Sequence, residues 1–195
     1  MIKIELVEDN SQKQAVKSII EKHHSYVASN DSVGRRIDWL VYHSDYTNVL
    51  GLEKPIGMVG IGSSVYPPPK DILGYVKMKK DVYKDNFNSF ANNWRFCLRE
   101  KIKNAGTQIL KELRKQAPLH WKQKYNNDLK YLITFVAGGN NGAVYKADNW
   151  IHCGETAGLP KHESVSMKWH NKEELKELYV KPTGENKKLI FIKKV

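Results

Sequence analysis

WRFCLREKIKNAGTQILKELRKQAPLHWKQKYNNDLKYLITFV, residues 94–136, carries the clearest structural pattern in the chain. Apolar residues recur at helical spacing over 102–117 with lysines facing outward, which predicts an amphipathic helix. Pro118 is expected to stop this helix or to kink its last turn. A short strand is expected at 94–98, and the nearly continuous apolar run 129–136 predicts a central buried strand. The stretch therefore predicts a strand, a long helix and a second strand in succession.

Weaker patterns on either side extend this order. Further strands are expected at 2–7, 37–43, 56–62 and 189–192, and shorter helical segments at 15–23, within 140–158 and at 172–178. The run Pro67-Pro68-Pro69 is expected to force an extended connection. The order predicts a single α/β domain over residues 1–195, in which the Lys-rich segment 160–195 completes the sheet.

Charge is the most informative feature of the composition. The chain has 195 residues, of which 32 are Lys or Arg and 21 are Asp or Glu, giving a net charge of +11. A field of that size attracts polyanions such as nucleic acid. The alternative is a Lys-rich surface that serves only solubility.

The chain carries no signal for a membrane or for an oxidising compartment. It has no run of eighteen apolar residues, and its first ten residues carry acids where a signal peptide needs an apolar core. Cys97 and Cys153 are too few for a disulfide framework. We therefore expect a cytoplasmic protein without a membrane partner.

The predicted order of strands and helices resembles that of the N-acetyltransferase-like (GNAT) fold. That resemblance implies an α/β architecture with a mixed central sheet flanked by helices. It also implies that the strands before the long helix and before the last helix splay apart. The resulting cleft would take an acceptor and an acyl-thioester cofactor, acetyl-CoA or a related acyl donor.

Short motifs sharpen this resemblance. Residues 141–145, NGAVY, followed by Asn149 and Trp150, resemble the acetyltransferase motif whose tyrosine acts as general acid at the cofactor sulfur. Together with 90–96 (FANNWRF) and 154–158 (GETAG), they resemble phage Mom-type DNA modification proteins and Druantia DruA-type defence domains. The resemblance implies modification of DNA adenine at its exocyclic amine, which protects phage DNA from restriction. The target base would have to leave the double-stranded DNA helix.

The same resemblance assigns residues to the cofactor. It places the phosphate-cradling loop at 99–107 and implies cofactor binding by Arg99, Gly106, Thr107 and Asn141. Ordinary acetyltransferases carry a run of glycines in this loop, whose backbone N–H groups hold the pyrophosphate. This chain departs from that pattern, because Gly106 is the single glycine of the loop.

Tyr145, Asp148 and Arg95 are the candidate catalytic residues. Tyr145 would protonate a leaving thiolate, the alternative being a half-buried phenol bonded to a backbone carbonyl. Asp148 lies three residues on, so on a helix it shares the face of Tyr145 and could take a proton from the attacking amine. A capping aspartate is its alternative. Arg95 lies among apolar neighbours, so it must contact an anion or pair with a residue such as Glu155.

Polar side chains at the ends of predicted elements are the candidate substrate-binding residues. They are His23, His24, Tyr26, Ser63, Ser64, Tyr66, Asn92, Asn93 and Glu155. The amides of Asn92 and Asn93 could present bidentate edges to a base, or they could form a turn at the strand entry. Histidines that close a helix are stabilised by its dipole, which is a sufficient structural reason for His23 and His24.

Two lysine-rich segments are candidate DNA surfaces. The better one carries Lys77, Lys79, Lys80 and Lys84, with Tyr75 just before them and Tyr83 among them. Lysines track phosphates and aromatic rings stack on an extruded base. The other segment, 101–115, is more typical of a solvated helix face.

A metal site is the weakest hypothesis. His120, His152, Cys153, His162 and His170 are ligand types without ligand spacing, so we expect no structural zinc, while a loosely held iron stays open. The sequence thus predicts an acyltransferase-like enzyme acting on DNA adenine. The alternatives are a conventional acetyl-CoA-dependent N-acetyltransferase for a protein or small amine, and a non-catalytic DNA-binding module of a defence or counter-defence system.

Overall fold

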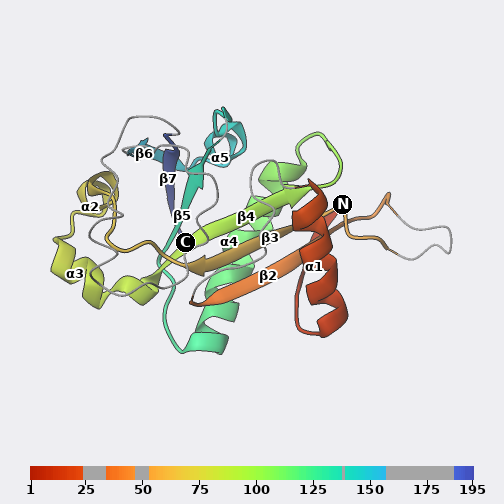
Figure 1. The fold of residues 1–195 in the computed structure, drawn as a ribbon, viewed down its shortest axis with the longest axis horizontal. Coiled ribbons are helices and arrows are strands. Elements are labelled where there is room, and N and C mark those ends of the chain that lie inside the picture. The colour runs from red at the N-terminus through yellow and green to blue at the C-terminus, as the bar shows by residue number, and fades with distance from the viewer. Residues whose placement is uncertain (24–33, 47–52, 138, 157–186) are drawn as a thin grey trace, which may run out of the picture.

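A seven-stranded mixed sheet runs through the molecule (Figure 1). The structure, a computed structural model, describes residues 1–23, 34–46, 53–137, 139–156 and 187–195. The strands are β1 (Ile2–Leu6), β2 (Arg36–His43), β3 (Gly57–Ser63), β4 (Phe90–Leu98), β5 (Tyr131–Val136), β6 (Ile151–Glu155) and β7 (Leu189–Lys194). They lie side by side in the order β1-β2-β3-β4-β5-β7-β6, so the last strand of the chain inserts between β5 and β6.

Helices cover both faces of the sheet. They are α1 (Asn10–His23), α2 (Lys70–Val76), α3 (Lys80–Asp85), α4 (Ala105–Tyr125) and α5 (Ala143–Ala147), with a short 3-10 turn at Phe87–Ser89. Figure 1 shows α1 in front of the sheet and α4 behind it. We call these two sides the α1 face and the α4 face.

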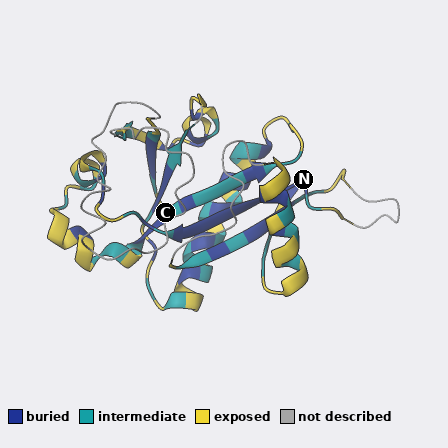
Figure 2. Ribbon diagram, viewed as in Figure 1, coloured by how far each residue is buried: buried dark blue, intermediate teal, exposed yellow. Residues whose placement is uncertain are grey.

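Three apolar clusters hold the layers together. Figure 2 shows in dark blue the buried residues of the strands and helices. The largest cluster lies on the α4 face, where Ile109, Leu113 and Trp121 of α4 pack on the sheet. On the opposite face, one cluster joins α1 to β2, β3 and β4, and another joins α2 and α3 to β4, β5 and β7. Leu132 and Ile133 are neighbours in β5 and enter clusters on opposite faces, as strand alternation requires.

The central strands β4 and β5 are parallel and separate after a short ladder. The ladder joins Phe90, Ala91 and Asn92 to Tyr131, Leu132 and Ile133, and ends there. Beyond this point the two arrows diverge in Figure 1. The sheet therefore opens between β4 and β5, as the resemblance to the GNAT fold implied.

A bulge in β4 accompanies this opening. Asn92 pairs with Gly62 and Arg95 with Gly60, so two residues of β4 stand opposite one of β3. The indole of Trp94 fills the space over Gly60, where a Cβ would collide with its Nε1. Bulges re-aim side chains, and this one reorients the residues that border the gap.

Two expectations about elements differ from the structure, and a third is not tested. Helix α4 does not end at Pro118 but continues to Tyr125. Trp121 explains this, because it is fully buried beyond the proline and its Nε1 donates a 2.9 Å hydrogen bond to the Asn88 carbonyl. The helices α2 and α3 follow Pro69, where the sequence predicted no helix. The predicted helix at 172–178 lies outside the described residues.

Candidate active site between β4 and β5

Tyr145 lies where β4 and β5 separate. It belongs to α5, a helix of five residues that begins after Gly142, and Asn141 Oδ1 accepts a 3.0 Å hydrogen bond from the Ala143 amide there. The phenol ring stacks on Phe191 and meets Trp150 edge to face, so it is only 7% exposed. These contacts fix the ring and leave its hydroxyl directed at the two strands.

The Tyr145 hydroxyl joins a buried polar network at the first positions beyond the ladder. It donates a 2.8 Å hydrogen bond to Asn93 Oδ1, and Thr134 Oγ1 lies 3.4 Å from it. The Asn93 amide nitrogen donates to the carbonyls of Gly60 and Arg95, at 2.8 and 3.0 Å. Asn93 can therefore offer only its oxygen to the tyrosine, which orients the phenol proton. The sequence singled out Tyr145 and Asn93, but Thr134 gave no signal inside an apolar strand.

Asp148 lies in a buried ion pair with the long helix. Arg114 of α4 binds both carboxylate oxygens, at 2.9 and 2.7 Å, and the Trp150 indole donates a third hydrogen bond of 2.9 Å. The residue is 8% exposed. A carboxylate held by three donors clamps α5 to α4, and this ion pair gives Asp148 a structural role. The sequence placed Arg114 on a solvated helix face and so missed the pair.

Arg95 stacks on Trp94 on the α1 face. Its guanidinium lies 4.6 Å from the indole centre, and Arg36 lies 4.1 Å from the same ring. Asp38 accepts hydrogen bonds from Trp94 Nε1 at 3.1 Å and from Arg36 Nε at 2.5 Å. Burial raises the pKa of Asp38, against the opposing charge of Arg36. The expected partner Glu155 instead forms an exposed ion pair with Lys187, at 3.8 Å.

The loop from β4 to α4 carries the residues assigned to a cofactor. Arg99 Nε is buried and has no hydrogen-bond partner among the described residues. Asn104, the residue before α4, makes no side-chain capping bond, and Thr107 Oγ1 donates back to its carbonyl at 3.0 Å. Gly106 has a packing role, because a Cβ there would collide with Val144 Cγ2 of α5.

The remaining substrate candidates are dispersed. Ser63 Oγ accepts a 2.9 Å hydrogen bond from the Arg35 amide, and Ser64 Oγ lies 2.7 Å from the buried Tyr83 hydroxyl, so both hydroxyls have structural partners. Tyr66 is 51% exposed, with Lys80 over its ring. His23 is exposed at the end of α1, and His24 and Tyr26 lie outside the described residues.

Neither cysteine is suited to nucleophilic chemistry. Burial raises the pKa of Cys97 to about 11, against the nearby charges of Arg99 and Arg95. Burial and then the charge of Asp71 raise the pKa of Cys153 to about 11. Both thiols are thus protonated at neutral pH and are poor nucleophiles.

No metal centre is found in the part of the chain that the structure describes. No group of three His, Cys, Asp or Glu side chains there could hold an ion, so the hypothesis of a bound iron has no support. His162 and His170 lie outside the described residues.

The lysine-rich segment around α2 and α3 differs in one respect from the expected DNA surface. Tyr83 is fully buried, so it cannot stack on a base, while Tyr75 is 41% exposed.

Among the described residues, no helix is long and apolar enough to cross a membrane.

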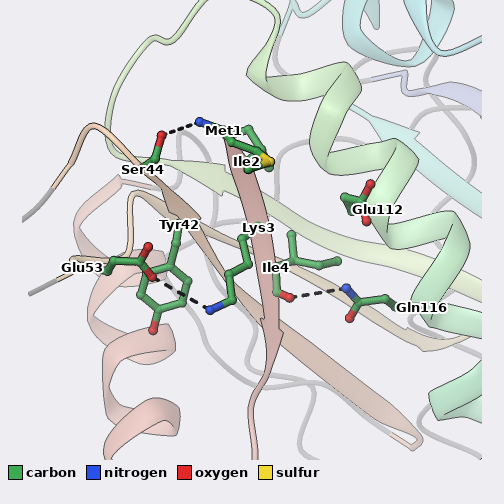
Figure 3. Close-up of a pocket in the computed structure, with 9 residues that line it drawn as sticks. All are labelled: Met1, Ile2, Lys3, Ile4, Tyr42, Ser44, Glu53, Glu112 and Gln116. Atoms are coloured by element: carbon green, nitrogen blue, oxygen red, sulfur yellow. Dashed lines mark hydrogen bonds and ion pairs between the residues drawn. The ribbon is translucent and has the colours of Figure 1, made fainter.

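A shallow hollow elsewhere on the molecule gathers none of the candidate residues. It lies at the edge strand β1, where Lys3 pairs with Glu53 and Gln116 of α4 reaches the Ile4 carbonyl (Figure 3). The Met1 ammonium donates to Ser44 at its rim. Because none of the candidate residues lines this hollow, we place the candidate site at the gap.

No protein-family model and no curated protein matches the chain. In structure it is similar to Arabidopsis thaliana NAA60 in complex with acetyl-CoA, with a TM-score of 0.60, 12% identity, and coverage of 100% of this chain and 99% of that one. For a Bacillus subtilis acetyltransferase in complex with CoA, the TM-score is 0.54 and the identity 8%, with coverage of 100% of this chain and 99% of that one. For a GNAT-family acetyltransferase from Streptococcus pneumoniae, the TM-score is 0.51 and the identity 13%, with coverage of 100% of both chains.

These similarities show the fold. The chain has the GNAT fold, and the prediction of a mixed, splayed sheet flanked by helices is confirmed. The finer assignment to Mom-type or DruA-type proteins has no support from any family model.

Proposed function

We propose that this protein transfers an acyl group from an acyl-CoA thioester to an amine, in the gap between β4 and β5. The observation that carries the proposal is the Tyr145 hydroxyl, held at the point where the two strands separate. The structural neighbours include two acetyltransferases solved with acetyl-CoA or CoA, which supports the choice of donor.

The residues at the start of α4 fit the phosphates of such a donor. The unpartnered Nε–H of Arg99 is a buried donor that an anion would satisfy. The first N–H groups of a helix have no partner within it, and the side chain of Asn104 does not cap them. Lys101 and Lys103 add positive charge to the same loop. We assign Arg99 and the first turn of α4 to the pyrophosphate.

Tyr145 supplies the proton that thioester cleavage requires. When bound, acetyl-CoA supplies a carbonyl carbon that forms a C–N bond with the amine as its C–S bond breaks, leaving a thiolate while the amine loses one proton to solvent. Tyr145 carries a proton at Oη, and turning its O–H bond away from Asn93 directs that proton into the gap. The Thr134 hydroxyl, 3.4 Å away, can donate a hydrogen bond to the phenol oxygen.

The acceptor in this proposal is an amine on a protein or small molecule. DNA adenine remains a second proposal, and the net charge of +11 is the observation that favours it. Binding of duplex DNA that weakens steeply with salt, together with a new adenosine species in the DNA of expressing cells, would support it.

Amine-dependent release of CoA thiol tests the proposed function. We expect wild-type protein to release CoA from acetyl-CoA only when an amine is added. Tyr145→Phe keeps the ring contacts and removes the proton, so the rate should fall about 100-fold or more. Tyr131→Phe, which alters a phenol at the start of β5, is the control and should keep full activity. Equal rates with and without amine would contradict the proposal.

A further inference from the structure

Asn92 presents a buried hydrogen-bond acceptor that no described residue satisfies. Its Oδ1 is buried and has no hydrogen-bond partner in the described part of the chain. The residue occupies the last rung of the β4–β5 ladder, opposite Ile133, directly before the strands separate. Native proteins rarely leave a buried acceptor unpaired, so this oxygen calls for an explanation, and a functional role is one of those known for such groups.

Strand alternation places Asn92 on the opposite face from Tyr145. Phe90, two residues earlier, and Ile133, its partner, both belong to the cluster under α2 and α3 on the α1 face. Asn93 binds the Tyr145 hydroxyl on the other side. The gap is therefore bordered by an orphan acceptor on the α1 face and by a proton donor on the α4 face.

Charged residues lie in rows beside Asn92. Arg36, Gly62 and Asn92 are partners across three neighbouring strands, and Gly62 has no side chain to separate the other two. The next row holds Asp38, Gly60 and Arg95. With two guanidinium groups and one carboxylate around Trp94, these rows carry net positive charge. A cation-rich acceptor such as a polyamine is repelled there, and an acceptor with a carboxylate near its amine is attracted.

We propose that Asn92 Oδ1 receives the N–H of the acceptor amine on the α1 face, and that the acceptor carries a carboxylate near that amine, as an acidic peptide N-terminus does. This inference rests on the proposed acyl transfer. The unfilled acceptor destabilises the free protein, and the hydrogen bond from the amine satisfies it. The amine then lies at the opening of the gap, across the sheet from Tyr145.

Asn92→Leu tests the assignment through stability and kinetics together. Leucine keeps the branched shape and removes the orphan oxygen, so the melting temperature should stay equal or rise. The KM for a peptide with a free α-amine followed by two glutamates should rise about 10-fold, with the KM for acetyl-CoA unchanged. Wild type should prefer this peptide to spermidine at least 10-fold in kcat/KM. Asn88→Leu, at an exposed site, should change none of these quantities.

The outcomes separate this inference from the function on which it rests. Wild type that neither binds acetyl-CoA nor releases CoA overturns the proposed function and this assignment with it. Active wild type whose Asn92→Leu variant keeps the same KM for the peptide, or melts several degrees lower, overturns the assignment alone. Preference for spermidine overturns the acceptor class.

Discussion

At the scale of single residues, hydrogen-bond partners indicate what each candidate side chain does. Tyr145 and Asp148 lie three residues apart and looked equally capable in sequence. In the structure the tyrosine hydroxyl borders the gap, whereas the aspartate is held by Arg114 and Trp150. The partner from α4 is remote in sequence, and its position on a helix face does not distinguish it from a solvated arginine. Sequence alone could therefore not separate the two roles.

Asp148→Asn should lower stability with little direct effect on chemistry. Breaking the pair leaves the Arg114 charge without its counterion, which costs about 2–4 kcal/mol, because Arg114 is 28% exposed rather than fully buried. For a chain of this length that is a fall of roughly 5–12 °C in melting temperature. Asp128→Asn, at an ion pair with 73% of the aspartate exposed, is the control and should leave it unchanged. An unchanged melting temperature with lost activity would restore Asp148 as a catalytic base.

His120 should make stability depend on pH. Its Nδ1 accepts a 3.2 Å hydrogen bond from Trp39, and burial lowers its pKa below 6.5, against the charge of Glu8. Neutral histidine is thus the folded form. The contribution of neutral His120 to the free energy of unfolding is present above pH 6.5. It is lost as the pH falls through the folded pKa of His120.

Melting temperatures of wild type and His120→Gln between about pH 5 and pH 7 check this expectation. Glutamine keeps an acceptor for Trp39 and does not titrate, so its curve should be flatter. Parallel curves for the two proteins would show that another group is responsible.

At the scale of elements, periodicity predicted the long helix and the central strands, because both bury continuous apolar faces. Periodicity failed to predict the helix end, because a few tertiary contacts hold the helix together beyond a helix-breaking proline. Pro118 lacks the N–H that continues a helix, yet Trp121 and Tyr125 hold the following turns against Asn88 and Arg36. The helices α2 and α3 are only 7 and 6 residues long, too short for a clear period.

Gly106→Ala should disturb the junction between α4 and α5. An added Cβ would collide with Val144 Cγ2, so the two helices must move apart, which lowers both stability and affinity for acetyl-CoA. Gly74→Ala in α2 is the matched control, because nothing lies within 4 Å of its new Cβ. That variant should gain roughly 0.4–1 kcal/mol in stability. Similar effects of the two alanines would contradict the packing role of Gly106.

At the scale of the whole molecule, the fold follows from many weak apolar preferences, while the choice of substrate depends on a few side chains. The order of elements was therefore enough to predict the GNAT fold, which the structural similarities confirm. Motif similarity and a charge of +11 were not enough to establish DNA as the substrate. Charge reports on partners at long range and leaves the reaction undetermined.

Isothermal titration of acetyl-CoA into the protein tests the central claim most directly, because every role proposed for the gap between β4 and β5 requires that donor. We expect one saturable site per chain, with affinity reduced about 10-fold or more by Arg99→Ala, which removes a charge-assisted phosphate contact. Lys122→Ala, at the far end of α4, should bind as wild type does. Absence of saturable heat with folded wild-type protein would contradict the claim.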